Sequence, residues 1–181
     1  RKINKNINFT SGIDFRSYAG EHYREVVNLL GGDYYVHHYA KAGEKGTERM
    51  RGVGGIVDYH NTGYHNWYGA WAQVEYSSAL WSAIFSSARS VSRYQRQEQY
   101  NETAGDEFSK ALIFPGNALK LGINYNVSEN LNVFLAAGQM SKAPKFSNSY
   151  LAYSNTPNTG AKNENITSID FGASYLSLIH I

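Results

Sequence analysis

The chain has 181 residues, enough for one domain, with 18% charged residues and a formal net charge of +2. This near-neutral balance argues against a nucleic-acid partner, and the absence of cysteine excludes a disulfide-stapled scaffold. The 15 tyrosines and 17 glycines beside only 3 prolines are typical of a β-rich protein with amphipathic aromatic side chains in excess.

Six segments alternate apolar and polar residues with the period of two that indicates β-strands. In chain order they are residues 6–18, 63–77, 80–97, 119–127, 131–136 and 166–175. The register of 80–97 stays open, since its apolar residues share a parity with two arginines: Trp81, Ala83 and Phe85 with Arg89 and Arg93. Because neighbouring side chains on a strand point to opposite faces, each other segment has one apolar face. We expect that face to be the convex side of a curved sheet, carrying Ile7, Phe9, Ile13, Phe15, Tyr68, Val74, Leu121, Ile123, Leu131, Val133, Ile169 and Phe171.

The connections between these segments alternate in length. Two are short enough for hairpins, at residues 77–79 and 128–130, and three are long and polar, at roughly 19–62, 98–115 and 141–165. Tight turns at one end and long loops at the other are typical of bacterial outer-membrane barrels, whose strands are about 10 residues long. We therefore expect an all-β fold in which antiparallel strands follow one another up and down.

Aromatic residues fall near both ends of the expected strands. Those near the short turns are Tyr76, Trp81, Tyr125 and Tyr175, and those near the long loops are Tyr18, Tyr64, Tyr68 and Tyr94. Tyrosine and tryptophan favour membrane interfaces, so we expect two aromatic girdles. A soluble β-sandwich also places polar residues outward, and the alternation by itself leaves that alternative open.

Four stretches resemble TonB-dependent outer-membrane receptors, especially those of Bacteroidetes-type bacteria. They are FTSGIDFRSYAGEHYREVVNLLGGDYY at residues 9–35, HNTGYHNWYGAWAQVEY at 60–76, LNVFLAAGQMSKAPKF at 131–146 and NENITSIDFGASY at 163–175. In the last stretch Glu164 and Gly172 match the pattern of the family. Asn163 replaces its usual proline, and Asp170-Phe171 replaces its usual Glu-Leu.

The resemblance implies a transmembrane β-barrel of 22 strands in the cell outer membrane, of which about six would lie in this chain. Residues 1–175 would form a partial barrel domain without the plug and the closing strands, and 176–181 would be a non-native tail. The implied function is import of a scarce nutrient, such as an iron chelate or a vitamin, with energy transmitted by TonB. The implied partners are outer-membrane lipid, the plug domain of the same protein, TonB, and a small-molecule or chelate ligand.

The candidate binding residues fall in two groups. The first long loop is rich in tyrosine and histidine, and loops longer than about 12–15 residues are usually functional or disordered. Its candidate ligand-binding residues are Tyr23, Tyr34, Tyr35, His37, His38 and Tyr39. The second group consists of charged residues on the polar faces, which would face a barrel lumen: Asp14, Arg16, Glu75, Lys120 and Asp170.

The sequence gives little reason to expect a metal site or catalysis. Adjacent His37 and His38 point apart in extended chain, and neither cysteine nor carboxylate spacing completes a tetrahedral set. No nucleophile has an evident activating base, so we expect neither an enzyme nor a cofactor. The alternative to a transporter is a non-transporting binding or adhesion protein with long surface loops.

Overall fold

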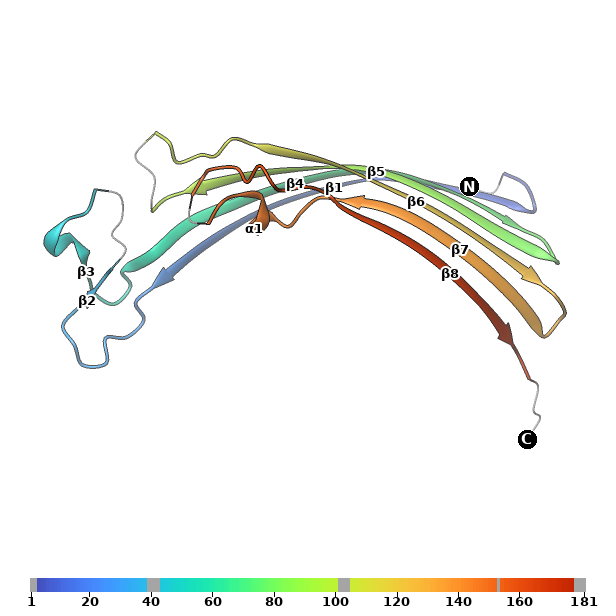
Figure 1. Ribbon diagram of the computed structural model, residues 1–181, viewed down its shortest axis with the longest axis horizontal. Coiled ribbons are helices and arrows are strands. Elements are labelled where there is room, and N and C mark those ends of the chain that lie inside the picture. The colour runs from blue at the N-terminus through green and yellow to red at the C-terminus, as the bar shows by residue number, and fades with distance from the viewer. Residues whose placement is uncertain (1–2, 39–42, 101–104, 153, 178–181) are drawn as a thin grey trace.

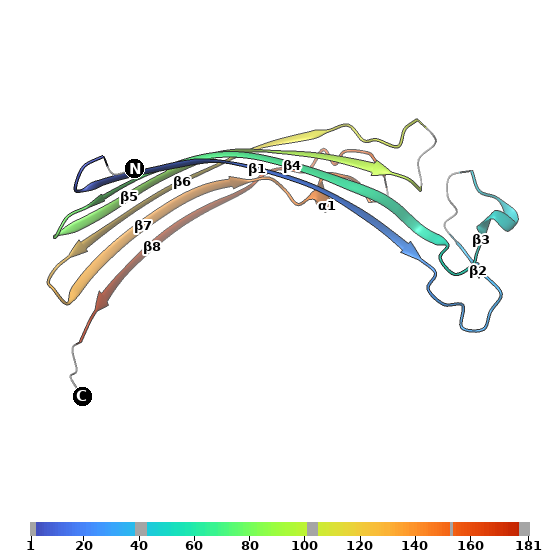
Figure 2. The ribbon, with the colours of Figure 1, turned by 180° about the vertical axis from the view of Figure 1, so that it is seen from behind.

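Six long strands pair in the order in which they follow one another along the chain, in a computed structural model that describes residues 3–38, 43–100, 105–152 and 154–177. Every pairing is antiparallel, which confirms the expected all-β, up-and-down order. The strands form one curved sheet shaped like an arch (Figures 1 and 2). They are β1 (Ile7–Glu25), β4 (Ile56–Ser77), β5 (Trp81–Glu98), β6 (Leu112–Asn126), β7 (Leu131–Lys142) and β8 (Glu164–Tyr175).

The two short turns share one design, built around a serine. In the β4–β5 turn, the Ser78 amide donates to the Trp81 carbonyl at 2.9 Å, and the Trp81 amide donates to the Ser78 hydroxyl at 3.2 Å. Ser128 and Leu131 repeat both bonds in the β6–β7 turn, each at 3.1 Å. A serine hydroxyl can take the place of a missing backbone partner, which lets the chain reverse within a few residues.

The long connections gather at the opposite end of the sheet. The first of them carries the two-stranded ladder of β2 (Tyr35–Val36) and β3 (Met50–Arg51), with the 3-10 helix η1 (Gly46–Arg49) between them. The third contains the single-turn helix α1 (Phe146–Ser149). Both views place α1 under the arch, on its concave side (Figures 1 and 2).

The register assigns every strand residue to a face. Ile123 pairs with Ala83 and Leu135, and Leu135 pairs with Phe171, so these four side chains form one row on one face. Tyr94 has the opposite parity and its ring contacts Phe146 of α1, which makes the row of Ile123 the convex one. All twelve residues expected on the convex face lie there, and none of them is buried.

For β5, which corresponds to the expected segment 80–97, the pairing shows which face each residue is on. The convex residues include Trp81, Ala83, Phe85, Arg89 and Arg93. The girdle near the long loops is only half as expected. Tyr64 and Tyr68 are convex, but Tyr18 and Tyr94 have the opposite parity and lie on the concave face.

Burial concentrates toward the loop end of the arch, away from the middle of the sheet. The described side chains other than glycine that are buried are His37, Val57, Ser92, Tyr94, Arg96, Glu98, Tyr100, Ser109, Ser149 and Tyr150. In the middle of the convex face, Phe85 of β5 is 50% exposed and its partner Leu121 of β6 is 47% exposed. Within the described residues, no helix is long and apolar enough to cross a membrane.

Candidate functional site: the loop end and the two faces of the sheet

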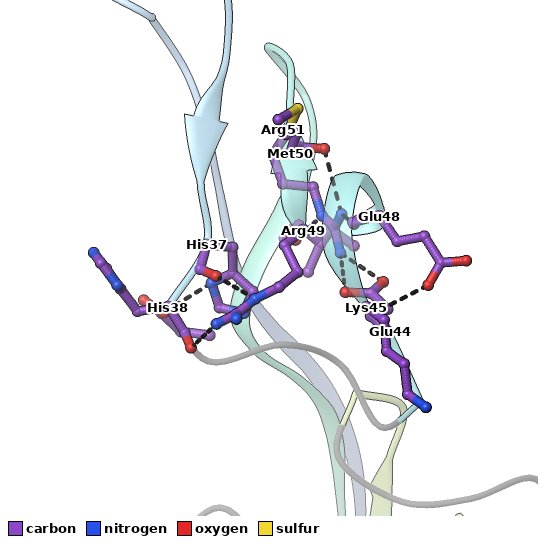
Figure 3. A network of polar contacts seen from close by, with 10 residues as sticks. His37, His38, Glu44, Lys45, Glu48, Arg49, Met50 and Arg51 are labelled. Atoms are coloured by element: carbon purple, nitrogen blue, oxygen red, sulfur yellow. Dashed lines mark hydrogen bonds and ion pairs between the residues drawn. The ribbon is translucent and has the colours of Figure 1, made fainter.

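The first long loop folds into a compact module braced by two arginines, which we call the β2–β3 module (residues 35–38 and 43–51). The guanidinium of Arg49 donates to the carbonyls of His37, at 3.1 Å, and of His38 (Figure 3). Arg51 donates from one nitrogen to both carboxylate oxygens of Glu44, at 2.6 Å each, and this partner raises the pKa of Arg51. Charge-assisted bonds of this kind are roughly twice as strong as neutral ones, so the module has a defined shape.

His37 lies inside this module. Its side chain is 0% exposed, its ring stands edge-on to Tyr100 at 5.5 Å, and its Nδ1 is 3.5 Å from the Asp58 carboxylate. Burial lowers the pKa of His37, and the nearby negative charge of Asp58 only partly opposes that shift. His37 therefore lies inside the module and not on the loop surface, and a role for it in ligand binding stays a prediction.

A bulge in β4 brings Asp58 to this position. The β1–β4 register shifts between Tyr23, which lies opposite His60, and Arg24, which lies opposite Val57, so Asp58 and Tyr59 are inserted on the β4 side. Asp58 adopts a left-handed backbone conformation with φ 66°, and its carboxylate also pairs with Arg24. The bulge thus joins the module to the ends of β1 and β4.

The other candidate ligand-binding residues remain on the surface. Tyr23 at the end of β1 is 47% exposed. Tyr34, just before the module, is 50% exposed, and Tyr35, its first residue, is 40% exposed. His38 is exposed, and Tyr39 lies outside the described residues. The structure therefore leaves three tyrosines and one histidine available at the outside of this loop.

The third long loop folds back over the concave face and is held there by aromatic side chains. The Tyr94 hydroxyl donates to the Pro144 carbonyl at 2.9 Å, and the Tyr150 hydroxyl donates to the Tyr94 carbonyl at 3.1 Å. Phe146 lies between the two tyrosine rings, 5.5 Å from each. Burial raises the pKa of Tyr150, so its hydroxyl stays protonated and keeps donating at neutral pH.

A buried ion pair joins this loop to β5. Arg96 and Glu98 are 8% and 0% exposed and pair with each other along one face of β5. Arg96 also donates to the Ser154 carbonyl at 3.0 Å, and Asn155 donates to the Glu107 carbonyl at 2.8 Å. The second and third long loops are therefore tied together above the sheet. Sequence reasoning missed this pair, although an arginine and a glutamate two residues apart share one face of a strand.

The five charged residues expected to face a lumen all lie on the concave face. Arg16 pairs with Asp14 at 2.6 Å and covers the ring of Trp67 at 5.2 Å. Glu75 accepts from Asn8 across the strands at 3.2 Å. Lys120 and Asp170 stand farther along the same face. This face combines charge with large rings, and it is polar enough to meet water.

The convex face is divided into an apolar band with two borders. Toward the loops the band ends at polar convex residues, along a line through Ser17, Asn66, Arg89, Asn117, Gln139 and Thr167. Beyond that line the convex positions are mixed, since Tyr64, Val91, Ile113 and Pro115 are also convex. Near the short turns the band ends in aromatic rings, namely Tyr76, Trp81, Tyr125 and Tyr175. Of the convex positions between the two lines, Ser11 and Ser87 carry a hydroxyl and the rest are apolar or tyrosine.

The border near the loops, which we call the upper border, is oblique to the strands, and the border near the short turns is called the lower border. Thr167 of β8 lies in the register row of Ser11, whereas the border crosses β1 at Ser17, six residues farther on. Six residues correspond to about 20 Å along a strand, and the five intervening strand spacings to about 24 Å, so the strands tilt by about 40° from the normal to the border. The lower border slopes the same way, from Tyr76 down to Tyr175.

Comparisons with protein-family models, with curated proteins and with solved structures give no match for this chain. Among the described residues, no cluster of three or more histidine, aspartate or glutamate side chains could hold a metal ion. We therefore infer the function of the chain from the geometry of the two faces and of the loops.

Proposed function

We propose that this chain forms part of the wall of an outer-membrane β-barrel of the TonB-dependent receptor type, which imports a scarce nutrient. The oblique apolar band is the single observation that carries the proposal. The band is about ten residues long on β4 (66–76) and about eight on β6 (117–125), which at a tilt of about 40° gives a height of about 20–25 Å. Membrane barrels have strands tilted by about 35–45° and an apolar band of about 25 Å.

The contrast between the two faces supports the same proposal. A sheet of a soluble protein covers its apolar face with a second layer, because exposed apolar area costs about 25 cal/mol per Å². Here the apolar face is convex and exposed, and the concave face carries the charged residues. Lipid on the convex side and a solvated lumen or plug on the concave side satisfy both faces. Closure of about 22 strands would complete the wall.

The loop end supplies a surface for capture. Tyr34 and Tyr35 stand at the outside of the braced β2–β3 module, and tyrosine offers a large amphipathic contact area at modest entropic cost. We propose that these rings contact an incoming iron chelate or vitamin. Import would then use energy transmitted through TonB to the plug of the same protein.

The experiment uses the gene product that contains this chain, in its own cells. Uptake of a radiolabelled ferric chelate and of radiolabelled cobalamin is measured with and without collapse of the proton gradient. Energised uptake of one ligand should disappear on gene deletion and fall about tenfold in a Tyr34→Ala/Tyr35→Ala variant. Unchanged uptake of both ligands on deletion would overturn transport of this nutrient class. Energy-independent binding that deletion removes would instead favour an adhesion protein.

A further inference from the structure

Two arginines stand on the convex face at the upper border of the apolar band. Arg89 lies in the register row of Asn117, and Arg93 lies four residues nearer the loops, in the row of Asn66 and Ser17. The convex residues in these two rows, all of them described, include no carboxylate. Within the described part of the chain neither arginine forms an ion pair. Two positive charges therefore project from the rim of an apolar surface without a counter-charge.

A shallow groove of about 560 Å³ lies beside these arginines, across β1, β4 and β5. Ala70 forms its low floor between taller side chains, and Phe15 and Tyr68 form one wall with their rings 5.1 Å apart. On the convex face the groove is lined by Ile13, Phe15, Tyr68, Ala70, Arg89 and Val91. Asp14, Gly69 and Ser90 complete the lining from concave positions, and the carboxylate of Asp14 is paired with Arg16. The groove is an apolar channel with a cation at its edge.

We propose that this groove binds one membrane lipid with an anionic phosphate headgroup. An acyl chain would lie over Ala70, and the phosphate would accept hydrogen bonds from the guanidinium groups of Arg89 and Arg93. Guanidinium groups bind phosphate through paired N–H donors, and a long arginine side chain can carry its charge from the apolar zone to the headgroup level. The proposal rests on the proposed function, since it needs the convex face to lie against a bilayer.

Charge and shape together select this ligand. A free phosphate would use the arginines but leave the apolar groove empty, and a zwitterionic lipid would bring a cationic group close to both arginines. An anionic lipid satisfies the groove and the arginines at once. Each arginine near an anionic lipid surface favours binding, so two of them should give a preference on the order of tenfold.

The test uses a fluorescent probe in the groove. In a cysteine-free version of the whole gene product, Ala70→Cys is labelled with bimane and the protein is reconstituted into phosphatidylcholine vesicles. Acyl-brominated phosphatidylglycerol and acyl-brominated phosphatidylcholine are then compared as quenchers. The anionic lipid should quench at about tenfold lower mole fraction, and Arg89→Gln/Arg93→Gln should abolish the difference. Arg89→Lys/Arg93→Lys should keep part of it, and Lys120→Gln on the concave face should keep all of it.

The outcomes separate this inference from the proposed function. Equal quenching by both lipids, or a preference that survives the double glutamine variant, would overturn the lipid site while leaving the membrane-facing assignment intact. No quenching by either lipid would overturn the proposed function itself. Inorganic phosphate should not restore fluorescence, and full reversal by phosphate alone would refute the role of the acyl groove.

Discussion

Replacing Leu121 by arginine tests the direction in which the convex face points. On β6 the band runs from Asn117 to Tyr125, and Leu121 lies midway between them. Four residues on either side correspond to about 13 Å along the strand, or about 10 Å along the membrane normal at a tilt of about 40°. An arginine on the lipid face of a barrel costs about 2–4 kcal/mol at the midplane and about 0–1 kcal/mol near the interfaces.

Leu121→Arg should therefore lower the free energy of unfolding from a bilayer by about 2–4 kcal/mol, which is a loss of stability. Ile123→Arg should cost less, about 1–2 kcal/mol, because Ile123 is only two residues from the lower border at Tyr125. Asn124→Arg is the matched control. Asn124 is concave and donates to Asn126 at 3.1 Å, so its replacement should change stability by about 0.5 kcal/mol or less.

The assay is a urea titration of the whole gene product folded into phosphatidylcholine vesicles, with the heat-modifiable mobility of the barrel on gels as the measure of folding. Equal losses at Leu121 and Asn124 would refute the assignment of faces. A larger loss at Ile123 than at Leu121 would keep the faces but move the midplane, and with it the borders of the band.

Two further predictions concern the loop end. Glu98→Gln should lower the free energy of opening the third long loop by about 3–5 kcal/mol, because it leaves Arg96 buried without its charged partner. Glu164→Gln removes one member of an exposed pair and should change this free energy little. Hydrogen exchange of residues 143–152 measures both, and equal protection would contradict the role of the buried pair. The pH dependence follows from His37, whose lowered pKa means that the unfolded module takes up a proton more readily than the folded one. The β2–β3 module should be most protease-resistant above about pH 6.5 and lose resistance as pH falls, in a His38→Gln variant as in the parent but not in His37→Asn.

Alternation and loop length were enough to predict strand order and the faces of five strands, because both depend on local sequence. The positions at which the strands end were harder to predict from the sequence. β1 extends to Glu25 and β4 begins at Ile56, whereas the alternating pattern covered only 6–18 and 63–77. Beyond the apolar border both faces of these strands meet water or loops, so pairing continues while the apolar signal stops.

The sequence pattern predicts a strand that begins at residue 119, whereas β6 begins at Leu112, and the reason is Pro115. A proline normally marks the end of a strand because it cannot donate to the ladder. Pro115 pairs with Val91 of β5, but the β6–β7 ladder ends at Asn117, so its other side is a sheet edge. The Pro115 carbonyl accepts from the Asn163 side chain at 2.5 Å at that edge. The backbone N–H and C=O of one residue in an antiparallel strand point to the same side. The nitrogen of Pro115 therefore faces the sheet edge, and its lack of a hydrogen costs no bond of the ladder.

The misplaced half of the upper girdle has a different cause. Tyr18 shares the even parity of Asn8, Thr10 and Asp14, so the sequence already contained its concave position. Tyr18 lies near a strand end, as a girdle residue would, but its parity directs the side chain to the concave face. Burial of His37 and the pairing of Arg96 with Glu98 could not be read in this way, because both depend on segments brought together by the bulge at Asp58 and by the folding back of the third loop.

The strands extend beyond the upper border of the apolar band by different lengths at the two edges of the sheet. β1, β4 and β5 continue well beyond the border, to Glu25, from Ile56 and to Glu98, and form a tall wall that carries the β2–β3 module. β7 and β8 stop soon after it, and the chain between them turns inward over the concave face. That inward loop is bonded to β5 through Tyr94 and Arg96, and Asn163 at its end also donates to Ser141 of β7 at 3.0 Å. The loop therefore places an aromatic cluster, made by Tyr94, Phe146 and Tyr150, against β5 on the concave side of the loop end.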